Sequence, residues 1–79
     1  MDVEVSLNVS LARYLPGNGS QKTIHLSLEA DSTVQDIFRH LEIPEKNVKL
    51  IFINGVHTTK QVSLSDGDRV GMFPPLGGG

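Results

Sequence analysis

Apolar and polar residues alternate strictly at the start of the chain, as in a β-strand with one buried face. The apolar positions are Val3, Val5, Leu7, Val9 and Leu11. A cluster of turn-forming residues occupies positions 16–20, and the alternation then resumes at Ile24, Leu26 and Leu28. Because such a turn brings the chain back beside itself, we predict an antiparallel hairpin from residues 3–11 and 24–28.

The spacing of apolar residues next changes to that of an α-helix. One stripe at positions i, i+3, i+4 and i+7 is formed by Val34, Ile37, Phe38 and Leu41. Thr33 is suited to cap the N-terminus of this helix together with Asp36. Pro44 disfavours a helical conformation in the residue before it. We therefore expect the helix to end near Ile43 and a short turn to follow over residues 44–47.

The remainder of the chain predicts further strands. Residues 48–56 are mostly apolar, which is typical of a strand with little solvent on either face, and the pair Asn54-Gly55 favours a tight turn at its end. We predict a brief extended segment around Val62 and Leu64, a turn over 65–68 and a last strand over 69–73. The order is β-β-α-β-β-β with a short fourth strand, an α+β domain in which the helix covers the sheet.

Length and composition limit the classes of function. The 79 residues suffice for one domain, and the lack of cysteine excludes disulfides, thiol nucleophiles and thiolate metal sites. Seven basic and nine acidic residues are interspersed along the sequence, so we expect no nucleic-acid partner. No segment approaches the roughly 20 apolar residues that span a bilayer, and no signal peptide is recognisable. We therefore expect a cytoplasmic protein that does not bind membranes.

Histidines and glycines provide the first candidates for a side-chain site. His25, His40 and His57 lack the spacing of metal ligands, and surface positions explain them more simply. The glycines within residues 17–19 suggest a phosphate loop, but the sequence contains no G-x-G-x-x-G motif and no lysine-serine pair that opens a helix. We therefore predict neither a metal site at the histidines nor a phosphate loop at the glycines.

Two acidic residues and the phenylalanines have alternative interpretations. Asp66 and Asp68 could form an acid–base pair or bind a hard cation, but a tight turn also selects Asp and Gly. Phe38 and Phe52 lie in core patterns, where burial is the ordinary explanation. Phe73 stands where the last strand meets two prolines, and it is either an exposed anchor for a partner or a packed residue.

The sequence closes with Phe-Pro-Pro-Leu-Gly-Gly-Gly over residues 73–79. Prolines end strand pairing because they lack an N–H, and glycines lose the most entropy when they are ordered. We therefore predict a folded domain over residues 1–75 and a flexible tail over residues 76–79. The reactive group of this tail is the carboxylate of Gly79, and a slim segment that presents a carboxylate suits delivery into the narrow active site of another protein.

Residues 66–79, Asp-Gly-Asp-Arg-Val-Gly-Met-Phe-Pro-Pro-Leu-Gly-Gly-Gly, resemble the C-terminal signature of the MoaD/ThiS family of ubiquitin-like sulfur carriers. In that family a D-G-D-x-V turn and strand lead into F-P-P-x-x-G-G. Gly78 and Gly79 occupy the family's glycine pair, and Gly77 fills a variable position. The F-P-P element is more similar to the small subunit of molybdopterin synthase than to the carrier of the thiamin pathway.

This resemblance implies a β-grasp, ubiquitin-like fold, a mixed sheet of four to five strands with one main helix packed across it. It also implies that the chain is a carrier rather than an enzyme and binds no cofactor directly. A separate adenylating enzyme, using ATP and magnesium, converts the Gly79 carboxylate into an acyl-adenylate, and a sulfur donor then yields a thiocarboxylate. The sulfur passes into molybdopterin, a related tungsten cofactor or thiamin.

The resemblance assigns the chemical step to Gly79, with Gly78 beside it. The expected partner-binding residues are Phe73, Pro74, Pro75, Leu76 and Gly77. Arg69 and the turn over 66–68 are further candidates for a polar rim, because they lie close by in sequence. The implied partners are the adenylating enzyme, the sulfur donor and, in the molybdopterin pathway, the large subunit of the synthase, and we expect a monomer in their absence.

Two other functions share these sequence features. A ubiquitin-like protein modifier is also adenylated at its last glycine, but the glycine then forms an isopeptide bond with a lysine of another protein. A β-grasp interaction module makes no use of the tail. The sequence leaves these alternatives open, because the first two begin with the same reaction.

Overall fold

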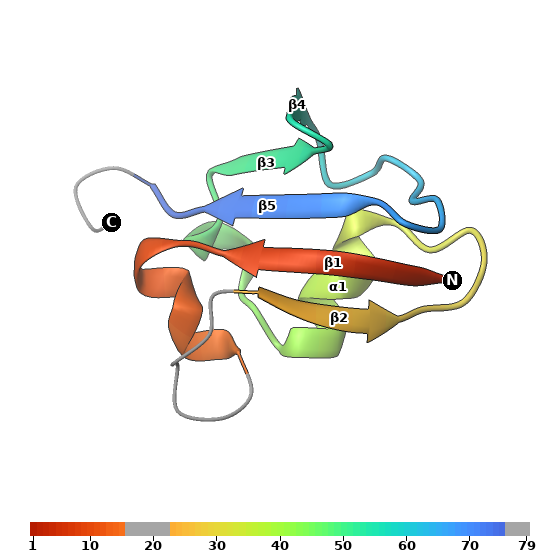
Figure 1. Cartoon of the computed structure of the whole chain (residues 1–79). Coiled ribbons are helices and arrows are strands. Elements are labelled where there is room, and N and C mark those ends of the chain that lie inside the picture. Colours follow the sequence, from red (N-terminus) through yellow and green to blue (C-terminus); the bar gives the residue numbers. More distant parts are fainter. Residues whose placement is uncertain (16–22, 76–79) are drawn as a thin grey trace.

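The computed structural model of the chain describes residues 1–15 and 23–75. Within these residues, five strands form one sheet, and one α-helix lies across one of its faces (Figure 1). The strands are β1 (Asp2–Leu7), β2 (Thr23–Ser27), β3 (Leu50–Ile53), β4 (Val56–Thr58) and β5 (Arg69–Phe73). The α-helix is α1 (Val34–Leu41), and two 3-10 helices are η1 (Val9–Tyr14) and η2 (Glu45–Asn47).

The strand that precedes the C-terminal segment, β5, lies at the centre of the sheet. The strand order is β2-β1-β5-β3-β4, with β5 parallel to β1 and antiparallel to β3. β2 and β4 are antiparallel to their neighbours, so the predicted antiparallel pairing of the first two strands is confirmed. The predicted turn over residues 16–20 lies outside the described residues. The mixed sheet with one helix packed across it confirms the expected β-grasp arrangement.

The core lies between one face of the sheet and α1. Side chains alternate across a strand, so every second residue of β1 and β5 points toward the helix. The buried residues of these two strands are Val3, Val5, Leu7, Val70 and Met72, and those of the helix are Val34, Ile37 and Phe38. Burial of each such side chain contributes about 1.5–3 kcal/mol to the free energy of folding, because its apolar surface is removed from water.

The helix begins where the sequence predicts. The backbone N–H of Thr33 donates to Oδ2 of Asp36 at 2.8 Å, the half of a capping box made by the acidic side chain. The helix ends at Leu41, slightly before the expected end near Ile43, because Glu42 adopts a left-handed φ of 57°. The N–H of Ile43 then donates to the carbonyl oxygen of Phe38 at 2.9 Å, which closes the last turn.

The prediction that the first strand continues to Leu11 is wrong. Asn8 donates from its backbone N–H and its side-chain amide to the carbonyl oxygen of Met72, at 3.2 and 3.1 Å, and the strand ends there. Val9 then turns away with φ of 56° and is 76% exposed. Leu11, within η1, and Leu15, just after it, are both buried in the core. Leu11 therefore keeps the apolar alternation of the strand although the strand has already ended.

The strand predicted within residues 48–56 is β3, and the tight turn predicted at Asn54-Gly55 is confirmed, but the expected burial of the strand on both faces is wrong. β3 and β4 are separated by Asn54 and Gly55, whose φ values of 52° and 85° are those of a tight hairpin turn. α1 covers only one face of the sheet, so Ile51 is buried while Leu50 on the other face is 38% exposed.

The predicted extended segment near residues 62–64 is also not a strand. Ser63 forms one isolated bridge with Thr33, and the short strand is β4 instead. The predicted turn before the last strand is confirmed, with Gly67 at φ of 86°. The proposed division of the chain at residue 75 stays a prediction, because residues 76–79 lie outside the described residues.

Candidate functional site

β5 carries the chain to one end of the sheet, and both neighbouring strands fix the point where it leaves. The N–H of Lys49 donates to the carbonyl oxygen of Phe73 at 2.8 Å, on one side of β5. On the other side, Asn8 holds the carbonyl oxygen of Met72 through its two hydrogen bonds. Pro74 and Pro75 lack the N–H that a longer ladder requires. The prediction that the last strand runs over 69–73 and meets the prolines directly is therefore confirmed.

An apolar cluster lies beside this exit on the sheet face opposite α1. We call it the exit patch, and it consists of Leu50, Phe52 and Phe73. Phe73 is paired in register with Leu50, and its ring meets that of Phe52 edge to face with centroids 5.8 Å apart. Phe73 is 37% exposed, so it both packs against Phe52 and presents apolar surface to solvent. The prediction that Phe52 is a core residue is wrong, because its neighbour Ile51 faces the core instead.

The predicted site residues divide into those the structure describes and those it does not. Phe73, Pro74 and Pro75 lie together at the exit, and the two prolines are partly exposed. Leu76, Gly77, Gly78 and Gly79 lie outside the described residues. The assignment of adenylation and thiocarboxylation to Gly79 therefore stays a prediction.

The polar rim expected from Arg69 and the turn before it is wrong. Arg69 begins β5, whereas Phe73 ends it, and four residue steps along a strand cover about 13 Å. Arg69 also pairs in register with Glu4 in the middle of β1. Arg69 and the turn therefore lie toward the end of the sheet that is opposite the exit.

The acidic residues of that turn have structural partners. Oδ1 of Asp66 accepts a hydrogen bond from the N–H of Asp2 at 2.7 Å. Asp68 accepts from the N–H of Ser65 at 2.8 Å and from the side-chain amide of Asn54 at 3.0 Å. These bonds fasten the turn to β1 and to the β3–β4 hairpin, which supports the structural interpretation of both carboxylates.

The three histidines are exposed and lie on different elements. Nε2 of His25 is 3.4 Å from a carboxylate oxygen of Glu4, and the ring of His57 lies 5.5 Å from that of Phe52. Among residues 1–15 and 23–75, no group of three or more His, Asp or Glu side chains is placed to hold a metal ion. The same part of the chain contains no helix long and apolar enough to cross a bilayer.

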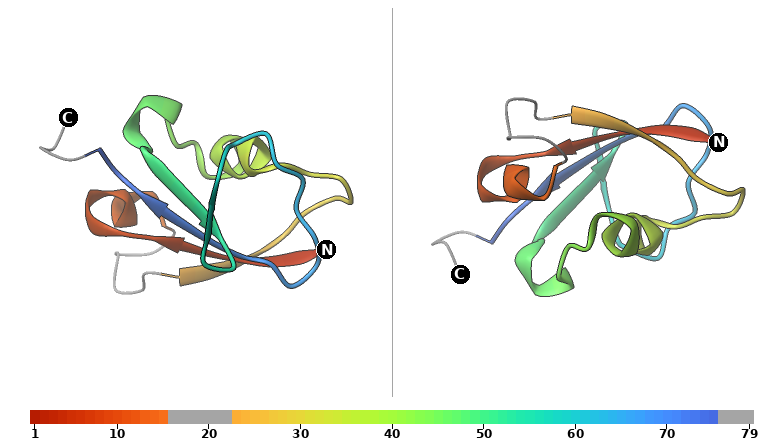
Figure 2. Two further views of the ribbon diagram at one scale, coloured as in Figure 1. Left: turned by 90° about the horizontal axis from the view of Figure 1, so that it is seen from above. Right: turned by 90° about the horizontal axis from the view of Figure 1, so that it is seen from below.

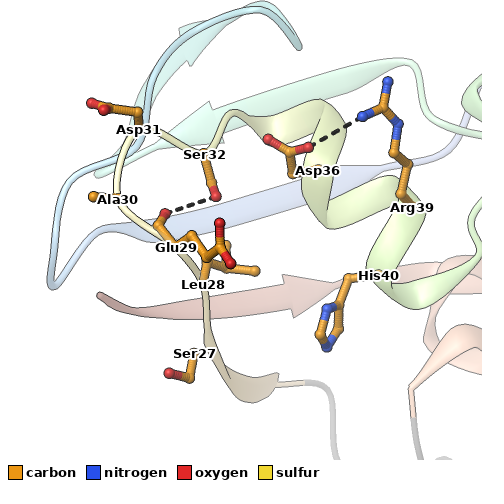
Figure 3. Close-up of a pocket in the computed structure, with 9 residues that line it drawn as sticks. All are labelled: Ser27, Leu28, Glu29, Ala30, Asp31, Ser32, Asp36, Arg39 and His40. Carbon is orange, nitrogen blue, oxygen red and sulfur yellow. Dashed lines mark hydrogen bonds and ion pairs between the residues drawn. The ribbon is translucent and has the colours of Figure 1, made fainter.

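A hollow of about 630 Å³ lies between α1 and the segment that joins it to β2 (Figure 3). Three of its polar side chains have local partners: Ser32 Oγ donates to the carbonyl oxygen of Glu29 at 2.8 Å, and Arg39 pairs with Asp36 at 3.4 Å. His40 points toward the same hollow from α1. The hollow begins where β2 ends, at the end of the sheet opposite the exit, so it is not part of the exit site.

A polar contact between the two 3-10 helices was not predicted from the sequence. The side-chain amide of Asn47 donates to the hydroxyl of Tyr14 at 2.8 Å, and Arg13 donates to the same hydroxyl at 3.2 Å. The hydrogen bond from Arg13 is the main cause that lowers the pKa of Tyr14, and the charge of Lys46 acts in the same direction. The contact connects η1 to η2 at the end of the sheet where β5 ends (Figure 2).

Comparisons with known proteins agree with this architecture. A family model described as the ThiS family matches residues 12–79. The solution structure of the HVO 2177 protein of Haloferax volcanii is similar over 100% of this chain and 87% of that one, with 28% identity and a TM-score of 0.76. No curated protein sequence matches the chain significantly.

Two further solved structures have lower identity and show the fold alone. SAMP1 from Haloferax volcanii is similar over 100% of both chains, with 19% identity and a TM-score of 0.74. A putative molybdopterin converting factor, subunit 1, from Pyrococcus furiosus is similar over 95% of this chain and 98% of that one, with 22% identity and a TM-score of 0.72. These likenesses confirm the β-grasp, ubiquitin-like fold.

Proposed function

The chain belongs to the ThiS family, and from this premise we propose that it carries sulfur on the carboxylate of Gly79. The family consists of small carrier proteins, so the chain is a substrate for other enzymes rather than a catalyst. In the proposed cycle, an adenylating enzyme uses ATP and magnesium to form an acyl-adenylate at Gly79 and releases pyrophosphate. A sulfur nucleophile from a donor then attacks the carbonyl carbon, AMP leaves, and a thiocarboxylate results.

The observation that carries this proposal is that the family match extends to residue 79 and so includes the glycine pair. A carboxylate is a poor electrophile because its two oxygens share the negative charge. Adenylation attaches a good leaving group, and this activation is required before a sulfur nucleophile can react. Gly78 has no side chain that would obstruct the approach of Gly79 to an active site.

The folded domain must supply most of the affinity for the activating enzyme. Ordering a backbone costs roughly 1–2 kcal/mol per residue, so fixing residues 76–79 in a channel costs on the order of 4–8 kcal/mol. The exit patch is an apolar surface beside the point where β5 ends, and Phe73 is exposed there. We propose that the exit patch docks on the partner with Pro74 and Pro75, while Leu76 and Gly77 enter the channel.

Molybdopterin synthesis is the pathway that we favour for the sulfur. The Phe-Pro-Pro element at residues 73–75 supports this choice, and so does the shared fold with a putative molybdopterin converting factor subunit. The chain then serves as the small subunit of the synthase and binds its large subunit in the cytoplasm. Transfer to a tungsten cofactor or to thiamin uses the same chemistry at Gly79.

Mass spectrometry of the intact protein tests the proposal. Replacing one carboxylate oxygen by sulfur adds about 16 Da, and this gain must map to the C-terminal peptide. The source cells supply the wild-type chain, and a variant lacking Gly79 is the matched control. We expect the mass gain in the wild type only. A wild-type chain that never carries sulfur, although the adenylating enzyme and the sulfur donor are present, would contradict the proposal.

Conjugation to proteins is the second candidate, because the chain shares its fold with SAMP1, which is named as a small archaeal modifier protein. This function also begins with adenylation of Gly79. It differs in the product, an isopeptide bond with a lysine, which is visible as higher-mass species on denaturing gels. Conjugates that disappear when Gly78 and Gly79 are deleted support modification, whereas an inert interaction module is unaffected by the deletion.

A further inference from the structure

The two ends of the sheet carry opposite charge, although charged residues are interspersed in the sequence. At the end opposite the exit, β1 and β5 begin and β2 ends. Five of the nine acidic residues lie there, namely Asp2, Glu29, Asp31, Asp66 and Asp68. The N-terminal ammonium group and Arg69 also lie toward this end (Figure 1), but the five carboxylates outnumber these two cations. This acidic end is separated from the exit by the length of β5.

Cations surround the exit. We call Arg13, Lys46 and Lys49 the basic collar; the first two lie in η1 and η2, and the third immediately precedes β3. Lys49 is held beside the end of β5 by its hydrogen bond to the carbonyl oxygen of Phe73. Figure 2 shows η1 and η2 on either side of the chain where β5 ends. The collar therefore lies around the exit.

The charges of the collar are free to act on a partner. All three side chains are exposed, and within the described residues none forms an ion pair. In contrast, Lys60 neutralises Glu45, the acidic neighbour of Lys46, through a short ion pair of 2.5 Å. The hydrogen bond from Arg13 is the main cause that lowers the pKa of Tyr14, and the charges of Arg13 and Lys46 make smaller contributions in the same direction.

We propose that the basic collar docks on carboxylates of the adenylating enzyme that surround the mouth of its channel for residues 76–79. This inference rests on the proposed function. Charge complementarity steers encounter and orients partners before contact, and it can raise association rates about tenfold or more. The acidic end of the sheet is repelled by the same carboxylates, so the exit end meets the enzyme first. An acidic surface on the enzyme would repel the Gly79 carboxylate by itself. The three cations of the collar outweigh this single negative charge, so the exit end as a whole is attracted.

The test uses an adenylating enzyme that gives ATP–pyrophosphate exchange with the wild-type chain. The variants are Arg13→Gln, Lys46→Gln, Lys49→Gln and their combination. Arg69→Gln is the matched control, because Arg69 is an exposed cation on β5 but lies toward the acidic end. The KM for the chain and kcat are measured at ionic strengths from about 0.01 to about 0.15 M, over which the Debye length falls from about 30 to about 8 Å.

We expect the triple variant to raise KM about tenfold at low ionic strength with kcat unchanged, and to lose most of the salt dependence that the wild type shows. Arg69→Gln should stay within about twofold of the wild type. Lys46→Arg and Lys49→Arg keep the charge and should behave as the wild type does. Urea denaturation verifies that all variants remain folded.

Two results overturn the inference in distinguishable ways. If the wild type supports exchange but the triple variant has the same KM and salt dependence, or if Arg69→Gln has an equal effect, the collar does not dock while the proposed function stands. If no adenylating enzyme from the source cells gives exchange with the wild type, or if exchange persists without Gly79, the proposed function fails and the collar proposal fails with it.

Discussion

Truncation of Phe73 to alanine should weaken binding to the activating enzyme more than it weakens the fold. A phenylalanine offers about 150–250 Å² of surface, and Phe73 is 37% exposed, so about 75 Å² is accessible in the free chain. Covering this surface at about 25 cal/mol per Å² stabilises a complex by about 1.9 kcal/mol. The loss of that contribution raises Kd about 20-fold.

The same substitution also affects the free chain. Phe73→Ala removes the edge-to-face contact with Phe52, which is worth about 0.5–1.5 kcal/mol, along with part of the packing area. Small domains have about 5–15 kcal/mol of stability, so the variant should remain folded. Phe73→Leu retains apolar surface at the same position and should bind with intermediate affinity.

Calorimetric titration against the adenylating enzyme measures these affinities. Val56→Ala is the control, because Val56 is 67% exposed but lies on β4, the edge strand farthest in the sheet from β1 and η1. Its Kd should match that of the wild type. If Phe73→Ala is folded and binds within about twofold of the wild type, the exit patch is not the docking surface.

Three further predictions concern the fold. Ile37→Ala empties a fully buried position between α1 and the sheet and should lower the free energy of unfolding by about 2–5 kcal/mol in urea titrations; a loss below about 1 kcal/mol would contradict the packing described. Asn8→Ala removes the side-chain bond to the carbonyl oxygen of Met72 and should cost about 1 kcal/mol in the same assay, whereas exposed Val9→Ala should cost less. Lys60 donates a hydrogen bond to Glu45 and holds the pKa of Glu45 below its ordinary value, so the pKa in the folded chain lies below that in the unfolded chain. The pair therefore stabilises the fold at pH values above the unfolded pKa, and this stabilisation disappears as the pH falls through the folded pKa. The difference in urea midpoint between the wild type and Glu45→Gln should therefore shrink on acidification below the ordinary glutamate pKa, and a difference that is constant with pH would refute this assignment.

Periodic segments with clear boundary residues could be predicted from the sequence. The helix over Val34–Leu41 follows from one apolar stripe and a capping pair, and the strand over Arg69–Phe73 lies between a turn and two prolines. In both cases the local pattern and the tertiary environment favour the same structure. The mixed sheet and its single helix were implied by the family resemblance, and the observed strand order agrees with it.

The errors arose where local pattern does not identify the buried face. Leu11 continues the alternation of β1 but is buried from a 3-10 helix, which a period of two cannot reveal. Phe52 lies in an apolar run, yet α1 covers only the face that Ile51 occupies. The burial of residues in an apolar strand depends on which face another element covers, and that element lies elsewhere in the sequence.

The surroundings of the exit depend even more on tertiary contacts. Arg69 is near Phe73 in sequence but an extended strand separates them. Arg13 and Lys46 are distant from each other in sequence, but Arg13 donates to the hydroxyl of Tyr14, and so does Asn47, the residue after Lys46. The bond from Asn47 to Tyr14 joins residues 33 positions apart. No periodicity or motif in the sequence indicates that pairing, so the basic collar emerges only from the fold.

The most direct test of the account replaces the carboxylate of Gly79 with a primary amide and leaves every side chain unchanged. The acid and amide forms are compared in ATP–pyrophosphate exchange with the same adenylating enzyme. We predict exchange with the acid and none above background with the amide, because the amide has no oxygen anion to attack the α-phosphate of ATP. Equal exchange with both forms would contradict the claim that the chemistry of this protein takes place at Gly79.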